Sequence, residues 1–172
     1  MDSEIGNIKN ILLAEDDLRD VELTVASLEE HKLANRLQVV HDGAEALDYL
    51  YRRGKFKMRA GGDPIVVLLD LKMPKVSGLE VLRIIKGDEN LTTIPVVVLS
   101  SSRETPDLVE CYKLGVNAYV VKPVDFAEFV KAVNQLGIFW AAINEPPPQT
   151  GRENTPIQRS EALPPANKGG NP

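Results

Sequence analysis

The chain has 172 residues, enough for one domain with a substantial core, and its formal net charge of −5 argues against a general nucleic-acid binder. A single cysteine excludes an internal disulfide, and no apolar stretch approaches the roughly 18 residues of a membrane span. The acidic, polar residues 1–4 show no signal-peptide pattern. We therefore expect a cytoplasmic protein with no nucleic-acid or membrane partner.

The first expected element is a buried strand at residues 11–14, and its apolar run ends in the acidic triplet Glu15, Asp16 and Asp17. Apolar side chains at helical spacing follow through residues 18–32, so a first helix should begin here with Asp17 as its N-cap. The acidic triplet should therefore lie at the junction between a strand and a helix.

Residues 36–41 predict a second strand, and Asp42 with the glycine after it starts a second helix. The third strand, residues 65–69, is a continuous apolar run that ends at Asp70. A third helix should follow Ser77 and end near residue 87. Such uninterrupted apolar runs are typical of parallel strands that are buried on both faces.

The fourth strand, residues 96–99, leads into Ser100, and the helix after it should have Thr105 as N-cap and Gly115 at its end. The fifth strand, residues 119–121, ends at Lys122. The last helix begins at Asp125, with a glutamate three residues later as capping-box partner.

Five alternating strands and helices predict an α/β fold: a flavodoxin-like, doubly wound, five-stranded parallel sheet of strand order 2-1-3-4-5 with five helices. The carboxyl ends of the strands share one edge of such a sheet, so Glu15, Asp16, Asp70, Ser100 and Lys122 should converge there. Clustered carboxylates favour Mg²⁺, and a carboxylate beside a bound cation can attack phosphorus to form an aspartyl phosphate. Lys122 and Ser100 could balance charge on the phosphoryl oxygens.

These motifs together resemble the receiver domain of two-component response regulators, over residues 8–137. The resemblance is carried by Glu15-Asp16, Asp70 with Met73-Pro74-x-x-Ser77-Gly78, Ser100, and Tyr119-x-x-Lys122-Pro123. It implies that Asp70 is the phosphoacceptor and that the protein is not an enzyme, apart from slow self-dephosphorylation.

The resemblance also assigns further roles. Mg²⁺ would be held by the side chains of Asp16 and Asp70, by Glu15 through water, and by the main-chain carbonyl of Lys72. Ser100 would be the switch hydroxyl, Tyr119 the switch aromatic residue, and Lys122 the ion-pair partner of the phosphoryl group, with a cis bond before Pro123.

A narrower resemblance is to the single-domain regulators paired with bacterial phytochrome kinases. It rests on the basic segment 52–59, on residues 124–126, on the stretch 136–140 and on Asn144-Glu145-Pro146-Pro147. It implies a sensor histidine kinase of the bacteriophytochrome type as partner. The basic segment itself is interpreted as either a solvated loop or a docking surface for an acidic partner.

We expect an N-terminal extension at residues 1–7, the receiver domain at 8–144, and a disordered tail at 145–172, which holds seven of the 12 prolines. The apolar residues 138–143 extend the last helix. They either fold back over the core or form a homodimer contact, and we favour the dimer.

Four other functions compete with a stand-alone phosphoacceptor that signals by protein contact. A phosphorelay intermediate would pass the phosphoryl group onward, and a phosphorylation-independent adaptor would have no need of the acidic cluster. A haloacid-dehalogenase-type phosphatase needs an aspartate at the position of Lys72. A flavodoxin-like cofactor binder is disfavoured because Glu15 and its acidic neighbours would repel a phosphate.

Overall fold

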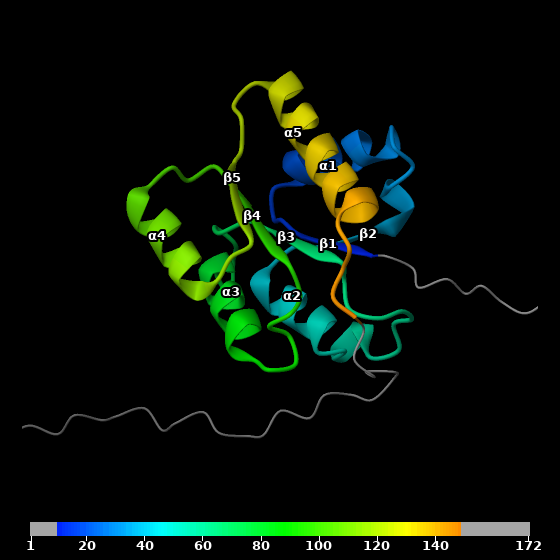
Figure 1. Ribbon diagram of the computed structural model, residues 1–172, viewed down its shortest axis with the longest axis vertical. Coiled ribbons are helices and arrows are strands. Elements are labelled where there is room, and N and C mark those ends of the chain that lie inside the picture. The colour runs from blue at the N-terminus through cyan, green and yellow to red at the C-terminus, as the bar shows by residue number, and fades with distance from the viewer. Residues whose placement is uncertain (1–9, 149–172) are drawn as a thin grey trace, which may run out of the picture.

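Five parallel strands form a single sheet in the computed structural model, which describes residues 10–148 (Figure 1). The strands are β1 (Ile11–Ala14), β2 (Leu37–Val40), β3 (Val66–Leu69), β4 (Val96–Ser100) and β5 (Ala118–Val121), and their order is β2-β1-β3-β4-β5. The predicted topology is confirmed. The whole of the expected N-terminal extension and most of the expected tail lie outside the described residues.

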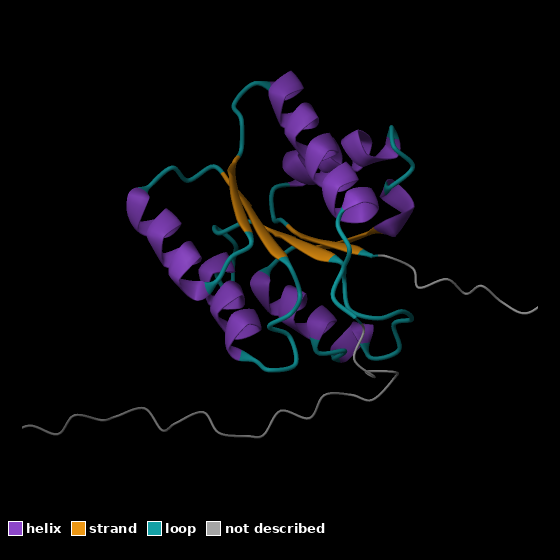
Figure 2. Cartoon of the chain, in the orientation of Figure 1, coloured by secondary structure: helices purple, strands orange, loops and turns teal. Residues whose placement is uncertain are grey.

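Two layers of helix cover the sheet. Figure 2 shows α1 (Leu18–Glu29) and α5 (Phe126–Ile138) against one face, and the other three helices against the opposite face. Those three are α2 (Gly43–Leu50), α3 (Gly78–Gly87) and α4 (Thr105–Leu114). Each crossover returns the chain to the same end of the sheet, which brings the carboxyl ends of all five strands together.

Side chains that alternate along the strands build a separate core on each face. Leu12, Val67 and Val98 pack into the larger core beneath α2, α3 and α4. Their neighbours along the strands, such as Leu13 and Leu68, pack on the other face. Because both faces of the central strands are buried, these strands read as continuous apolar runs and not as an alternating pattern.

Four of the helices begin as their sequence predicts. In each, the N-cap side chain accepts a hydrogen bond from a backbone N–H in the first turn, and these N-caps are Asp17, Asp42, Ser77 and Asp125. The expected N-cap at Thr105 is wrong by one residue. Glu104 is the N-cap of α4 and makes no side-chain cap bond, while Thr105 is already helical.

The expected cis bond between Lys122 and Pro123 is wrong. No peptide bond in residues 10–148 is cis. The trans form is intrinsically favoured even before proline, by about 0.5–1 kcal/mol. With this bond in the trans form, the Lys122 amine reaches the acidic side chains at the sheet edge.

The basic segment before β3 is packed against the protein through its arginines, while its two lysines remain exposed to solvent. Arg52 is buried and donates hydrogen bonds to the carbonyls of Arg59 and Gly61. The Arg59 guanidinium lies 4.2 Å from the ring centroid of Tyr49, at cation–π distance. The arginines in this segment therefore brace the long connection between α2 and β3.

The apolar extension after α5 packs partly against the core and is partly exposed. The chain continues from α5 as a π-helical turn, Phe139–Ile143. Trp140 and Ala141 fold back and pack against the core formed by β1, β3 and β4. Phe139 and Ile143 remain 44% and 68% exposed, so part of the apolar face stays in solvent.

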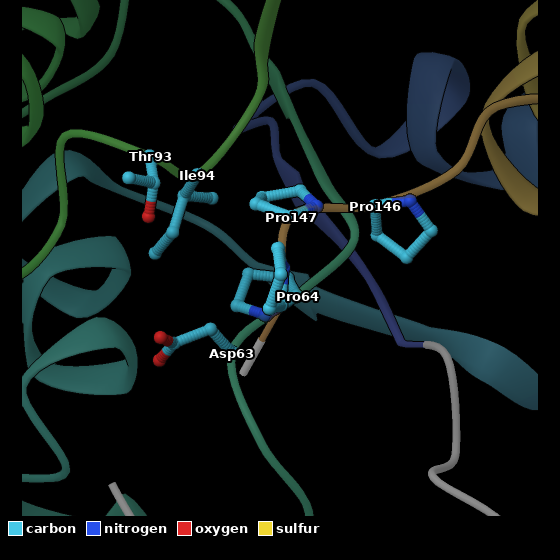
Figure 3. Close-up of a pocket in the computed structure, with 7 residues that line it drawn as sticks. Asp63, Pro64, Thr93, Ile94, Pro146 and Pro147 are labelled. Atoms are coloured by element: carbon cyan, nitrogen blue, oxygen red, sulfur yellow. The ribbon is translucent and has the colours of Figure 1, made fainter. Parts of the chain in front are cut away.

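The first prolines of the expected tail lie against the end of the sheet opposite the acidic edge. Figure 3 shows Pro146 and Pro147 beside Pro64 and Ile94, just before β3 and β4. Proline has no backbone N–H, so its packing here leaves no donor in need of an acceptor. The tail beyond Pro148 lies outside the described residues.

Candidate functional site

The sheet register brings the predicted site residues to one edge. Ala14 is level with Leu69 in the neighbouring strand, so Glu15 and Asp70 leave adjacent strands at the same height. The Asp70 N–H donates to the Ala14 carbonyl, and the Lys122 N–H donates to the Ser100 carbonyl. The backbone of the site is therefore fixed by the last rungs of the sheet.

Three carboxylates gather at this edge. One oxygen from each of Glu15, Asp16 and Asp70 lies within 4.8 Å of the others. Glu15 is 2% exposed and Asp70 8%, while Asp16 faces solvent. Burial raises the pKa of Glu15 to about 7, against the hydrogen bond from Lys122, which lowers it. Hard oxygen ligands spaced like this fit a divalent cation.

The Lys122 ammonium lies among these acids. Its Nζ donates to Glu15 Oε2 at 2.5 Å, to Asp20 Oδ2 at 2.7 Å and to Asp70 Oδ2 at 3.4 Å. Burial alone would lower the pKa of Lys122, but the hydrogen bonds to Asp20 and Glu15 raise it above its ordinary value. Lys122 is therefore a permanent cation next to the Asp70 carboxylate.

Asp20 is the site residue that sequence reasoning missed. It lies in the first turn of α1, three residues after the N-cap Asp17, and its side chain is 28% exposed. An acidic residue there reads as a favourable partner for the positive end of the helix dipole. The available signal was the spacing from Asp17. A residue three positions later lies about one helical turn on, so it faces the same sheet edge as the acidic triplet.

Ser100 and Tyr119 belong to a second group beside the carboxylates. Ser100 is fully buried at the end of β4, and its Oγ accepts from the Ser102 N–H at 3.3 Å. The Tyr119 hydroxyl donates to the Ser102 carbonyl at 3.0 Å, and the Ser102 hydroxyl donates to Asp107 Oδ2 at 2.6 Å. The loop after β4 thus joins both predicted switch residues to the start of α4.

The loop after β3 approaches Asp70 closely. The Lys72 N–H lies 3.5 Å from Asp70 Oδ1, at the limit of hydrogen bonding, and the Lys72 side chain faces solvent. A Cβ at Gly78 would lie 1.9 Å from the Asp70 carbonyl oxygen. Glycine in the motif that begins α3 is therefore required by this backbone contact.

Comparison with known proteins identifies the family. A family model described as the response regulator receiver domain matches residues 11–134. The chain belongs to this family. No helix within residues 10–148 of this receiver is both long and apolar enough to cross a membrane.

Two curated relatives are similar over most of this receiver chain. The probable methanogenesis regulatory protein FilR2 of Methanothrix harundinacea is 39% identical over 140 residues, which make up 80% of this chain and 86% of that protein. Response regulator Rcp1 of Synechocystis sp. is 35% identical over 140 residues, 81% of this chain and 94% of that protein.

Solved structures of this family share the fold. The phosphorylated cyanobacterial phytochrome response regulator RcpA is 36% identical with a TM-score of 0.76, covering 81% of this chain and 99% of that chain. The Mn(2+)-bound form of Rcp1 is 34% identical with a TM-score of 0.74, and the match covers 81% of this chain and 99% of that chain. The bacteriophytochrome response regulator RtBRR is 60% identical with a TM-score of 0.65, and the match covers 82% of this chain and 85% of that chain.

Proposed function

We propose that this response regulator accepts a phosphoryl group on Asp70 from the histidine of a separate sensor kinase in the cytoplasm. The observation that carries the proposal is the Lys122 ammonium, 3.4 Å from Asp70 Oδ2 and beside two further carboxylates. Phosphoryl transfer to a carboxylate requires a nucleophilic oxygen and positive charge near the phosphoryl oxygens. Asp70 and Lys122 meet those two requirements.

In the transfer step, a carboxylate oxygen of Asp70 forms a bond to phosphorus while the bond from phosphorus to the donor breaks. The donor, a histidine nitrogen or the acetate of acetyl phosphate, leaves with the electron pair. Lys122 keeps its proton and donates hydrogen bonds to the phosphoryl oxygens. In the slow hydrolysis of the aspartyl phosphate, water attacks phosphorus and the bond from phosphorus to the Asp70 oxygen breaks. The Asp70 carboxylate is regenerated, and inorganic phosphate keeps both protons of the water.

Glu15, Asp16 and Asp70 fit a Mg²⁺ ion because all three offer oxygen ligands around one point. We propose the Asp16 and Asp70 side chains, Glu15 through water and the Lys72 carbonyl as its ligands. A bound Mg²⁺ supplies charge neutralisation for the entering phosphoryl oxygens. Support comes from the acidic cluster and from the Mn(2+)-bound form of Rcp1.

We propose Ser100 and Tyr119 as the switch residues. Ser100 would move toward the phosphoryl oxygens, and the Ser102 N–H that donates to it would follow. The Ser102 carbonyl accepts from Tyr119 and the Ser102 hydroxyl donates to Asp107. Movement of the loop after β4 would therefore alter both β5 and the start of α4. The changed surface then contacts a downstream protein or a phosphotransfer partner.

For the kinase, we propose a bacteriophytochrome. The support is the 60% identity to the bacteriophytochrome response regulator RtBRR and the likeness to the phytochrome response regulator RcpA. FilR2, which is 39% identical, is named for the regulation of methanogenesis and not for a phytochrome. Membership of the receiver family alone therefore does not identify the kinase. A phosphotransfer profile against the histidine kinases of the source organism distinguishes the two cases.

The acceptor assignment is tested with the full chain, acetyl phosphate and MgCl₂. We expect intact-mass spectrometry to find one added PO₃ group on the wild type and none on Asp70→Asn, because an amide is not a nucleophile toward phosphorus. Asp48→Asn, on α2, is the matched control and should be modified like the wild type. Equal modification of Asp70→Asn would refute the assignment.

We also propose a homodimer that buries the exposed part of the C-terminal apolar turn. Phe139 and Ile143 are 44% and 68% exposed within five residues of chain, a patch that suits a second copy. The double substitution Phe139→Glu, Ile143→Glu should convert dimer to monomer in sedimentation velocity at micromolar concentration. A wild type that sediments only as monomer contradicts the proposal.

A further inference from the structure

Asp20 shares the Lys122 ammonium with the phosphoacceptor although it is not part of the carboxylate cluster. The Asp20–Lys122 distance is 2.7 Å, shorter than the 3.4 Å between Lys122 and Asp70. An ammonium has three protons, and with Glu15 as the third acceptor all of them are engaged. Phosphoryl oxygens can therefore approach Lys122 only if a carboxylate gives up its hydrogen bond.

The backbone of Asp20 is held independently of Lys122. Its backbone N–H donates to the N-cap Asp17 at 3.2 Å, and its carbonyl accepts from the Thr24 hydroxyl at 2.7 Å. Its charge lies at the positive end of the α1 dipole, which stabilises it there. Asp20 therefore carries its charge on a short side chain from a held backbone, whereas Lys122 is a charge on a flexible stem that can exchange partners.

We propose that Asp20 is a positioning residue that holds the Lys122 ammonium toward α1 and competes with the phosphoryl group for it. This inference rests on the proposed roles of Asp70 and Lys122. Before transfer, the contact keeps Lys122 from closing fully onto Asp70, which leaves the carboxylate available as a nucleophile. During transfer, Lys122 turns to the phosphoryl oxygens and loses its bond to Asp20.

The competition predicts that removing the Asp20 charge speeds phosphorylation. Asp20→Asn weakens a contact that stabilises the unmodified protein and is lost as the phosphoryl group enters. The second-order rate constant with acetyl phosphate and MgCl₂ should rise about threefold to fivefold, the size expected for one partly buried ion pair. Asp20→Glu keeps the charge and should stay within about twofold of the wild type.

Glu22→Gln is the matched control, because Glu22 is exposed on the same helix and the substitution changes net charge equally. It should leave the rate within about 1.5-fold, since a solvent-exposed charge is screened. An equal rise in Glu22→Gln would overturn the proposal in favour of a general charge effect. A fall in the rate for Asp20→Asn would also overturn it, because Asp20 would then assist transfer.

Coupling between Asp20 and Lys122 is measured independently of phosphorylation by urea unfolding in EDTA. Asp20→Asn should cost less stability in a Lys122→Met background than in the wild type, and additive losses would overturn the contact. Asp20→Asn in a Lys122→Gln background, which also removes the cation, gives the same comparison if the methionine variant fails to fold. The two proposals can fail separately. If acetyl phosphate leaves Asp70 of the wild type unmodified while Asp20 and Lys122 still couple in stability, the acceptor assignment and the competition for Lys122 are both refuted. The contact between Asp20 and Lys122 would still stand.

Discussion

Replacing Lys122 with methionine should lower the free energy of unfolding of the metal-free protein by about 3–5 kcal/mol at pH 8, the cost of breaking a buried ion pair from one side. Methionine keeps the length of the side chain, but Glu15 and Asp70 are left as buried carboxylates with no cation between them. Urea unfolding in EDTA, followed by circular dichroism, measures the loss.

The loss should depend on pH, and Glu15 sets the direction. Its pKa in the folded protein is about 7, raised from 4.5, so protonated Glu15 stabilises the fold fully below pH 4.5 and this contribution is lost as the pH rises through 7. Without Lys122 the folded-state pKa rises further. The variant should therefore recover most of its stability at pH 5.

Lys86→Met is the matched control for the pH dependence. Lys86 is partly buried, and its Nζ donates to the carbonyls of Thr92 and Ile94 and to Asn117 Oδ1, which are all neutral acceptors. Its loss should be about 1–2 kcal/mol and constant between pH 5 and 8. A Lys122→Met loss that is also independent of pH would contradict the electrostatic account of the site.

The strand ends were predictable from sequence because a parallel sheet fixes where they meet. Once the runs before Asp70 and Lys122 are read as parallel strands, the shared edge follows from topology. Asp20 was not predictable in the same way. Its role depends on how closely the first turn of α1 approaches the end of β5. Asp20 and Lys122 are separated by 102 positions in the chain, and no local pattern encodes their distance in space.

Side-chain stacking and caps show a second limit of sequence reasoning. The arginines of segment 52–59 carry the same charge whether they are solvated or stacked, so composition alone could not place Arg59 on the Tyr49 ring. The start of α4 was misplaced because Thr105 is a good N-cap residue, while the structure uses Glu104 without a side-chain bond. Tertiary packing decided both cases.

Trp140→Ala should cost about 3–5 kcal/mol of stability, the range for a large aromatic side chain removed from a core. Trp140 is 8% exposed and packs against Ile11, Ile65 and Val97. Its removal leaves a cavity in a cluster that, among the residues described, holds no other aromatic side chain, because Phe129 on the same face belongs to a neighbouring cluster. The C-terminal extension would then be a structural part of the receiver unit that we propose ends at residue 144.

Urea unfolding at low micromolar concentration, followed by circular dichroism, measures this loss, and the wild type offers an added probe because Trp140 is the only tryptophan in the chain. Its emission should shift to longer wavelength in the same transition as the loss of helix. Phe126→Ala is the control, because Phe126 is 62% exposed on α5 and should cost less than about 1 kcal/mol. If Trp140→Ala cost no more than this control, the extension would contribute nothing to the fold, and the receiver would end with α5.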